Sequence, residues 1–240
     1  MMFQKKNKSI INVAIITARK GSKRIKNKNL KLFFGKPIIY YSIKTLQKAK
    51  IFDEIIVSTN CNHTEEVSKK FGVNRIIRRP DHISTNKVGT VSVIKHSIKY
   101  LSKINIHPKY VCCLYPAAPL TSYKNIKFAY KLIKSRITKK GFIYPSTFLD
   151  KINKKKKKVL KNKLINLIKI NKKEGIVNNL FLDAGQFWYA KTYAWIKSNT
   201  VYKKNSFTFL IDEELSDINS IKDWEKVKKI YKNNKNKYVK

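Results

Sequence analysis

Short, nearly continuous apolar runs alternate along this chain with segments whose apolar residues recur at helical spacing. A run that is apolar at almost every residue predicts a parallel strand buried on both faces of a sheet. Apolar residues three and four positions apart predict amphipathic helices between those strands. The expected strands are IINVAIIT (10–17), DEIIVST (53–59), NRIIRRP (74–80), KYVCCLYP (109–116) and GFIYPS (141–146). This alternation predicts an α/β fold with a mostly parallel sheet.

The expected helices carry local signals of their own. Pro37 stands where PIIYYSIKTLQKA begins a helix, since proline fits the first turn. Asn62 followed by Glu65 predicts a capping box at the start of a short helix that reaches Phe71. The last helix, within SIKDWEKVKKIY (220–231), is expected to turn four apolar side chains to one face. These are Ile221, Trp224, Val227 and Ile230.

The pattern changes between residues 150 and 179, where short apolar pieces are separated by lysines. Two interpretations of this segment stay open: an inserted arm or hairpin that packs on a second subunit, or a disordered basic loop. Regular structure resumes at LFLDAGQFWYAK (180–191). We expect residues 1–240 to form a single domain.

The formal net charge of +40 is the most extreme property of the composition. Taken alone it points to nucleic acid or an anionic membrane. However, 48 of the 54 basic residues are lysine and they are spread along the chain. Nucleic-acid readers favour arginine for bidentate contacts to phosphate and guanine. We therefore expect solvated lysine faces and no specific nucleic-acid partner.

The cysteines and histidines argue against a disulfide framework and a zinc site. Cys112 and Cys113 lie inside an apolar run, where buried reduced thiols are usual, and Cys61 stands apart from them. The four histidines have no metal-ligand spacing. No apolar run is long enough to cross a bilayer. These features predict a cytoplasmic protein without a membrane partner.

The stretch TARKGSKRIKNKN (17–29) directly follows the first expected strand. Ligands of open parallel sheets bind at the carboxyl ends of strands. Gly21 permits a tight turn, and the N–H groups around Ser22 can cradle phosphate oxygens. The stretch is neither a Walker motif nor G-x-G-x-x-G, so the residues alone allow a phosphate loop or an ordinary basic turn.

This stretch resembles the signature R-x-G-S-K-R-I-x-x-K-N of the cytidylyltransferases that activate sialic-acid-type sugars. The matching residues are Arg19, Gly21, Ser22, Lys23, Arg24, Ile25, Lys28 and Asn29. Further matching blocks follow in the same order: GKPIIYYSI (35–43), FDEIIVST (52–59), RRP (78–80), Thr90 and DIN (217–219). The resemblance extends from about Ile11 to Trp224, which is nearly the whole chain.

Three segments resemble the pseudaminic acid branch of this group. They are YVCCLYPAAPL (110–120), DAGQFWYAKTYAW (183–195) and DINSIKDWEKVKKIY (217–231). The resemblance implies a Rossmann-like nucleotide-diphospho-sugar transferase fold in which an inserted arm, here 150–179, forms a homodimer. It also implies transfer of CMP from CTP to a nine-carbon 2-keto acid sugar, with Mg²⁺ and release of pyrophosphate, for surface glycan or flagellin glycosylation.

The resemblance also assigns roles to residues. Catalytic roles fall on Arg19, Lys23, Lys28 and Asp217, and nucleotide contacts on Arg19, Gly21, Ser22, Lys23, Arg24, Lys28, Asn29, Arg79 and Thr90. The sugar site takes Tyr115, Asp183 and Gln186, and the metal site Asp217 and Asn219. Without the resemblance, Asp183 reads as the cap of a turn.

Asn219 departs from the family pattern D-x-D, since a neutral carbonyl oxygen replaces the second carboxylate. This departure leaves a CTP-binding pseudoenzyme open as an alternative. Two further alternatives are a sialic or legionaminic acid cytidylyltransferase, which keeps the chemistry with another sugar, and a polyanion-binding protein, which the net charge of +40 motivates.

Overall fold

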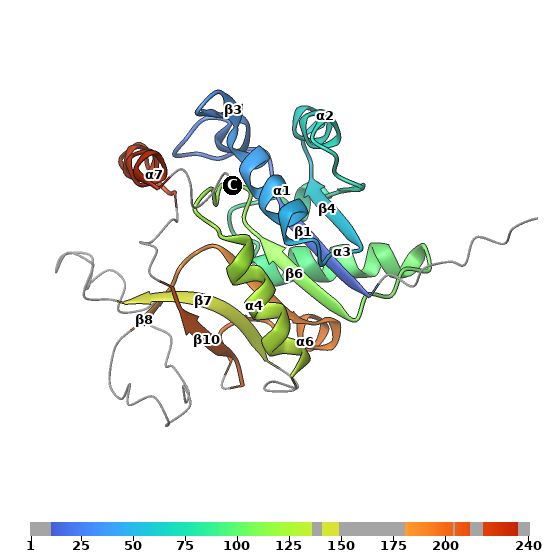
Figure 1. The fold of residues 1–240 in the computed structure, drawn as a ribbon. Coiled ribbons are helices and arrows are strands. Elements are labelled where there is room, and N and C mark those ends of the chain that lie inside the picture. The colour runs from blue at the N-terminus through green and yellow to red at the C-terminus, as the bar shows by residue number, and fades with distance from the viewer. Residues whose placement is uncertain (1–10, 136–140, 149–180, 204, 212–217, 235–240) are drawn as a thin grey trace, which may run out of the picture.

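The structure is a computed structural model that describes residues 11–135, 141–148, 181–203, 205–211 and 218–234. The predicted arm at 150–179 lies outside these residues, and so does Asp217. A mixed sheet runs through the described part (Figure 1). The sheet has eight strands in the order β10-β7-β9-β6-β1-β4-β5, with β8 paired to β7.

The sheet contains the five strands that the sequence predicts, close to their expected positions, and three more after residue 180. The strands are β1 (Asn12–Thr17), β4 (Glu54–Thr59), β5 (Arg75–Arg78), β6 (Tyr110–Leu114), β7 (Phe142–Phe148), β8 (Phe181–Asp183), β9 (Phe187–Lys191) and β10 (Phe207–Leu210). Strands β6, β1, β4 and β5 pair in parallel, and β10 is parallel to β7. Strand β9 runs antiparallel between β6 and β7, and β8 is antiparallel to β7. The predicted α/β fold with a mostly parallel sheet is confirmed.

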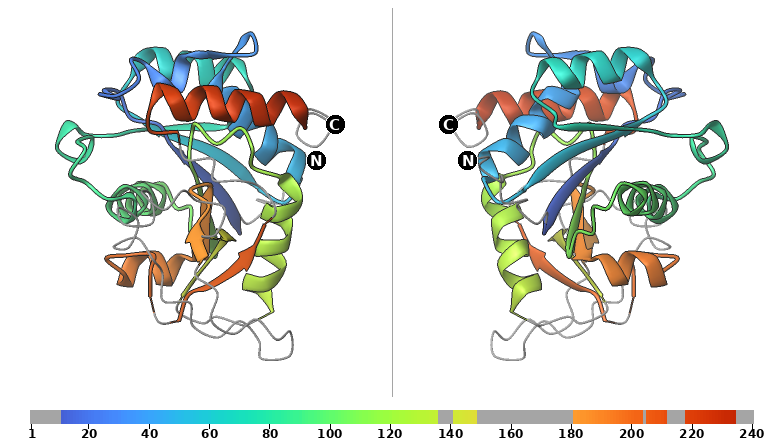
Figure 2. Two further views of the ribbon diagram at one scale, coloured as in Figure 1. Left: turned by 90° about the vertical axis from the view of Figure 1, so that its left-hand side faces the viewer. Right: turned by 90° about the vertical axis from the view of Figure 1, so that its right-hand side faces the viewer.

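Helices cover both faces of the sheet (Figure 2). The helices are α1 (Ile38–Ala49), α2 (Asn62–Lys70), α3 (Thr90–Lys103), α4 (Tyr123–Lys134), α6 (Thr192–Lys197) and α7 (Ile221–Asn233). Short 3-10 turns η1 (Lys28–Leu30) and η2 (Asp81–Ile83) and a hairpin of β2 (Leu32–Phe33) and β3 (Lys36–Pro37) complete the order. In the described residues no helix has the length and apolar character that crossing a bilayer requires.

Alternate residues of β1 face opposite sides of the sheet, and because both sides are buried the strand is apolar throughout. Ala14 and Ile16 join a core with α1, α2 and α4, whereas Val13 and Ile15 join a second core with α3 and α6. All four side chains are fully buried. Burying one isoleucine side chain contributes about 1.5–3 kcal/mol, so both helical layers depend on this strand.

A third apolar cluster connects the two ends of the described chain. It joins Ile25 and Phe33, from the segment after β1, to Ile218 and to Trp224 and Val227 of α7. Figure 2 shows α7 beside the loop and helix that follow β1. The cluster fixes the C-terminal helix against the loop that carries the predicted phosphate site.

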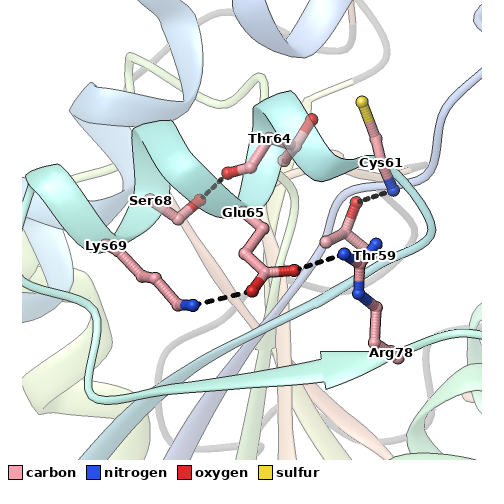
Figure 3. Close-up of polar contacts among 7 residues, drawn as sticks. All are labelled: Thr59, Cys61, Thr64, Glu65, Ser68, Lys69 and Arg78. Atoms are coloured by element: carbon pink, nitrogen blue, oxygen red, sulfur yellow. Dashed lines mark hydrogen bonds and ion pairs between the residues drawn. The ribbon is translucent and has the colours of Figure 1, made fainter.

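Two local predictions are wrong. Helix α2 begins at Asn62 with Cys61 as its N-cap, and no side chain caps it. The Glu65 carboxylate instead accepts from Lys69 at 2.7 Å and pairs with Arg78 at 2.8 Å, as Figure 3 shows. Opposite charge on both sides favours this arrangement and lowers the pKa of Glu65, with the Lys69 hydrogen bond as the largest cause.

The second error concerns the apolar face of α7. Trp224 and Val227 are buried as expected, but Ile221 is 52% exposed. Tyr231 takes its place as the third fully enclosed side chain of the helix. Ile221 is the first residue of α7 and lies beyond the edge of the cluster, so helical spacing alone misjudges it.

Candidate active site

The candidate site lies at the edge of the sheet where β1, β4 and β6 end. The loop after β1 is tied to its neighbours through polar side chains. The Asn29 amide donates to the carbonyl of Arg19 at 3.1 Å, and the Lys20 N–H donates to Asn60 Oδ1 at 2.8 Å. Gly21 has φ of +84°, a left-handed conformation that favours glycine. These contacts give the loop a fixed shape.

Arg19 folds its guanidinium back over this loop. Its Nη1 donates to the carbonyl oxygens of Lys20 at 3.1 Å and Gly21 at 2.9 Å. Its Nη2 donates to Asn86 Oδ1, from the segment between β5 and α3. The cation is therefore held by neutral oxygens, which position its charge without cancelling it.

Arg24 and Lys28 reach across to the segment that precedes α7. Arg24 Nη2 donates to Asn219 Oδ1 at 2.7 Å, and Lys28 Nζ donates to the Ile218 carbonyl at 2.7 Å. Each bond joins residues about 190 positions apart in sequence. The start of α7 is thus part of the candidate site.

These residues surround a cavity of about 550 Å³, which we call the loop cavity. Four cations line it, and its described lining includes no carboxylate. The principal lining residues are Thr17, Arg19, Ser22, Lys23, Arg24, Lys28, Asn29, Asn86, Tyr115 and Asn219. Cations that are held by neutral groups in a concave site suit a ligand with several negative charges.

The structure brings most of the predicted nucleotide residues to this cavity, but not all. Arg79 is 5% exposed and donates to the Ser58 carbonyl at 2.8 Å and to its hydroxyl at 3.3 Å. Burial lowers the pKa of Arg79 to about 10; Cys113 opposes this shift and the Arg19 charge adds to it. Thr90 is half-buried as the first residue of α3. Neither residue lines the loop cavity.

The predicted sugar residues lie beside the end of β6, because antiparallel β9 begins there. Leu114 pairs with Phe187, and the Tyr115 N–H donates to the Gln186 carbonyl at 3.0 Å. Tyr115 lines the loop cavity, and its ring meets Trp188 edge to face with centroids 4.8 Å apart. The β6–β9 pairing therefore brings the 183–188 segment next to the loop cavity.

Asp183 is held by a network of three donors. Its carboxylate accepts from the Gly185 N–H at 2.8 Å, from Trp188 Nε1 at 2.6 Å and from the Tyr202 hydroxyl at 3.0 Å. Although 46% of Tyr202 is exposed, its hydroxyl lies against Asp183. Burial of that hydroxyl, followed by the Asp183 charge, raises the pKa of Tyr202 well above its ordinary value. The bond to Gly185 is the turn cap that Asp183 suggests on its own.

Gln186 has the opposite character. The residue is fully buried, and neither polar atom of its side chain has a hydrogen-bond partner among the described residues. A buried amide without partners costs about 1–3 kcal/mol, so a group at this place needs a functional reason.

The predicted metal residues are described only in part. Asn219 offers one carbonyl oxygen, and that oxygen accepts from Arg24. Within the described residues no group of three or more His, Cys, Asp or Glu lies together as a metal site. Asp223 supports the same turn: it accepts from the Asn219 N–H at 3.1 Å and from Ser220 Oγ at 2.8 Å.

Three contributors, Asn86 and the pair Ser220 and Asp223, were not found by sequence reasoning. Asn86 lies in a polar stretch with no motif, so no local signal marks it. Asp223 and Ser220 form a capping pair at the start of α7, where Ser220 Oγ also accepts from the Asp223 N–H. The S-x-x-D spacing is a known helix-start signal and was sufficient to find that pair.

Known proteins resemble this chain over most of its length. A family model described as cytidylyltransferase matches residues 13–238. Pseudaminic acid cytidylyltransferase of Campylobacter jejuni serotype O:2 is 30% identical over 227 residues, 93% of this chain and 97% of the relative. N-acylneuraminate cytidylyltransferase of Escherichia coli O18:K1:H7 is 29% identical over 125 residues, 51% of this chain and 28% of the relative.

A solved structure shares the fold. It is CMP:2-keto-3-deoxy-manno-octonic acid synthetase complexed with CTP, with a TM-score of 0.71 and 12% identity. The match covers 93% of this chain and 99% of that one.

Proposed function

Because this chain belongs to the cytidylyltransferase family, we propose that it transfers CMP from CTP to the anomeric hydroxyl of pseudaminic acid and releases pyrophosphate. The observation that carries the proposal is the 30% identity to a pseudaminic acid cytidylyltransferase over 93% of this chain. The loop cavity supports it, since its fixed cations suit a triphosphate. The product would serve surface glycan or flagellin glycosylation.

In the proposed reaction the sugar hydroxyl attacks the α-phosphorus in line, and pyrophosphate leaves. Negative charge grows on the phosphate oxygens, so catalysis depends on positioning and electrostatic stabilisation. Arg19, Lys23 and Lys28 would stabilise the triphosphate and the leaving pyrophosphate. Gly21 and Asn29 would keep the loop in shape. The positive φ of Gly21 and the hydrogen bond from Asn29 to the Arg19 carbonyl support this role.

Ser22 and Arg24 complete the proposed nucleotide contacts. Ser22 lines the loop cavity and can donate to a phosphate oxygen. Arg24 lines it too, with its guanidinium on Asn219. Arg79 and Thr90 stay in the proposal as supporting residues of the nucleotide side: buried Arg79 stiffens the end of β4 through Ser58, and Thr90 opens α3.

On the sugar side we assign the direct contact to Gln186 and the walls to Tyr115 and Asp183. The unpartnered Gln186 amide would find its partners in sugar hydroxyl or acyl groups. Asp183 holds Trp188 and Tyr202 in place and would orient that wall. A site that hydrogen-bonds its substrate discriminates strongly against analogues that lack the group.

The family resemblance implies Mg²⁺, and the proposed ligands are Asp217 and Asn219. The donor chemistry fits, because carboxylate and amide oxygens are the ligands that a hard cation takes. When bound there, Mg²⁺ would neutralise part of the triphosphate charge. Binding through the Asn219 oxygen would compete with Arg24, which that oxygen accepts from at 2.7 Å.

The second candidate keeps the chemistry and changes the sugar. Its supporting observation is the similarity to N-acylneuraminate cytidylyltransferase, which covers 51% of this chain. A CMP-N,N'-diacetyllegionaminic acid synthase of Legionella pneumophila is 26% identical over 51% of the chain. Because these matches cover about half as much of the chain, pseudaminic acid remains the proposed substrate.

The test is pyrophosphate release by the full chain with CTP, Mg²⁺ and one sugar at a time. Pseudaminic acid should give the highest kcat/KM, followed by legionaminic and sialic acids. No release with any sugar, from folded protein that still binds CTP, would indicate the pseudoenzyme. Higher kcat/KM with sialic or legionaminic acid would move the assignment to that sugar.

A homodimer formed through residues 150–179 and a cytoplasmic location also belong to the proposal. Light scattering of the full chain, compared with a chain lacking 150–179, tests the dimer. A monomeric mass for the full chain at micromolar concentration would contradict it. Duplex DNA that binds tightly and with sequence preference at moderate salt would instead favour a nucleic-acid function.

A further inference from the structure

A second cavity, of about 600 Å³, lies between α1, the β2–β3 turn, the start of α4 and the end of α7. It shares no lining residue with the loop cavity. Its volume is within the range of sites that hold small organic ligands. We call it the tyrosine cavity. A ligand bound in it would occupy a site separate from that of the proposed reaction.

Aromatic rings make up an unusual share of its wall. Aromatic residues make up 12% of the chain, whereas five of the thirteen residues that line this cavity are aromatic. The rings contact one another, with Tyr231 stacked on Phe34 at 5.4 Å and edge to face with Tyr41 at 5.3 Å. Tyr40 and Tyr123 complete the set. Tyr231 is 3% exposed and supports the others, whereas Phe34 is exposed and Tyr40, Tyr41 and Tyr123 are half-buried. Accessible aromatic rings bind planar rings, because base–aromatic stacking contributes about 1–3 kcal/mol per base.

Four lysines share the wall with these rings: Lys36, Lys44, Lys48 and Lys232. No aspartate or glutamate is among the described residues that line the cavity. Lys44 Nζ lies 5.8 Å from the Tyr40 ring centroid, and Lys48 Nζ lies 5.0 Å from that of Tyr123. An anionic group that entered the cavity would meet ammonium groups already placed at its wall.

Thr121 gives an independent sign of a missing ligand. The residue lines the cavity and is 2% exposed, and its hydroxyl has no hydrogen-bond partner in the described structure. Its own backbone is satisfied, since its N–H donates to Ala118 and its carbonyl accepts from the Thr45 hydroxyl at 3.3 Å. A buried hydroxyl without a partner is costly, so a ligand that hydrogen-bonds it would gain affinity.

We propose that the tyrosine cavity binds a small nucleoside phosphate, with the base among the tyrosines and the phosphate on Lys44 and Lys48. A planar ring joined to an anionic group is the chemistry that matches both halves of the wall. The Thr121 hydroxyl, which has no partner in the described structure, would supply a polar contact to the ligand. The site is a binding site, and no reaction is assigned to it.

Methyl NMR of threonine-labelled full-length protein separates this cavity from the loop cavity. Thr121 and Thr45 line the tyrosine cavity, and Thr17 lines the loop cavity. Thr→Ser variants at each position assign the three signals. Titration with AMP should shift Thr121 and Thr45 along a saturable curve. Adenosine and inorganic phosphate should each bind at least about 10-fold more weakly, since each lacks one half of the recognised chemistry.

Two variants and a matched control locate the effect. Lys44→Ala with Lys48→Ala should weaken AMP binding, read at Thr121, by about 10-fold or more. Lys95→Ala with Lys99→Ala removes the same charge from α3 and should leave the curve unchanged. Thr121→Val removes the hydroxyl together with the labelled Thr121 methyl, so AMP binding to this variant is read at Thr45. It should weaken AMP binding several-fold without lowering the melting temperature.

Three outcomes would overturn the proposal. AMP shifts Thr17 alone, which would assign its binding to the loop cavity. The Lys44/Lys48 variant and the Lys95/Lys99 control give the same curve, which would indicate unspecific attraction to a basic protein. Inorganic phosphate binds as tightly as AMP, which would remove the ring from the recognised chemistry. Unshifted methyl signals away from the cavities show that each variant is folded.

Discussion

The loop cavity and the tyrosine cavity are both cationic, but they hold their charges differently. In the loop cavity Arg19, Arg24 and Lys28 are each bonded to a carbonyl or amide oxygen. In the tyrosine cavity Lys44 and Lys48 lie over aromatic rings, with Nζ 5.8 and 5.0 Å from the centroids, and the bond of Lys44 Nζ to Gln47 Oε1 stays within helix α1. Fixed cations stabilise charge at a defined place, as a transition state requires, whereas long side chains over rings adapt to a bound ligand. The loop cavity therefore suits catalysis and the tyrosine cavity suits binding.

The largest expected effect tests whether the loop cavity needs an acidic partner. Asp217→Ala should abolish pyrophosphate release, because the proposed Mg²⁺ would lose its carboxylate ligand. Asn219→Asp should keep or raise the rate, since it adds a second carboxylate beside Arg24. Turnover at several Mg²⁺ concentrations measures both. Full activity of Asp217→Ala would remove the metal role assigned to this residue.

Removal of one fixed cation should have the next largest effect. Arg19→Ala should lower kcat/KM for CTP by about 10²–10³-fold, the usual cost of losing one preorganised donor. Arg19→Lys keeps the charge but not the planar guanidinium that bonds the loop and Asn86. Its kcat/KM should therefore lie between those of wild type and Arg19→Ala. The control is Arg78→Ala, which removes an exposed cation that pairs with Glu65 and should leave the kinetics unchanged. Equal rates for Arg19→Ala and wild type would contradict a catalytic role for the fixed cations of the loop cavity.

A third prediction separates substrate contact from stability beside the loop cavity. Gln186→Leu should raise KM for the sugar by about 10-fold, the effect of losing roughly 1.4 kcal/mol of hydrogen bonding. The same change should leave the melting temperature of the free protein equal or higher, because it removes a buried amide without partners. A lower melting temperature with an unchanged KM would make Gln186 a structural residue.

The stability of the protein at alkaline pH should report on Tyr41, which lines the tyrosine cavity. Burial raises the pKa of Tyr41 to about 12, and its hydroxyl donates to the Phe33 carbonyl at 2.5 Å. The folded state therefore holds this proton more tightly than the unfolded chain does. Its contribution to stability is fully present below about pH 10 and is lost as the pH rises toward 12.

Because Tyr41 is only half-buried, we expect a contribution of about 1 kcal/mol. Urea unfolding between pH 9 and 12 should show a smaller loss of stability in Tyr41→Phe than in wild type. Tyr40→Phe serves as the neighbouring control. Parallel pH curves for wild type and Tyr41→Phe would contradict the assignment.

The smallest expected effect completes the comparison. Lys44→Ala with Lys48→Ala should change kcat/KM for CTP by less than about 2-fold, since these lysines line a cavity that shares no residue with the loop cavity. Pyrophosphate release measures it alongside the Arg19 variants. A loss of 10-fold or more would mean that the two cavities act as one site.

The sequence identified the parts of the site that are local. The loop from Arg19 to Asn29 follows a buried strand, which predicts its place at the carboxyl end of the sheet, and six of its cationic and polar side chains line the cavity. The bond from Arg24 to Asn219 joins residues 195 positions apart, and no local pattern contains it. Arg79 illustrates the reverse case: it matched a motif, but the packing that places its guanidinium on Ser58 could not be predicted from that match.

The fold shows the same division. Runs of apolar residues located the strands, because burial on both faces leaves a mark on every residue. The direction of β9 left no such mark, since an antiparallel strand with both faces buried has the same composition as a parallel one. That direction decides where Gln186 lies. The six-residue helix α6 was too short for a period to emerge.

The bonds from Arg24 and Lys28 to residues 219 and 218 also have a consequence for how the protein is made. During translation the loop leaves the ribosome well before its partners at the start of α7, which follow it by 190 and 195 positions in the sequence. A prematurely terminated chain that ends before residue 218 contains the whole loop, but its two cations lack their anchors and Ile25 lacks part of its apolar cover. Such a fragment should be inactive, so activity in this protein reports that synthesis has passed the start of α7.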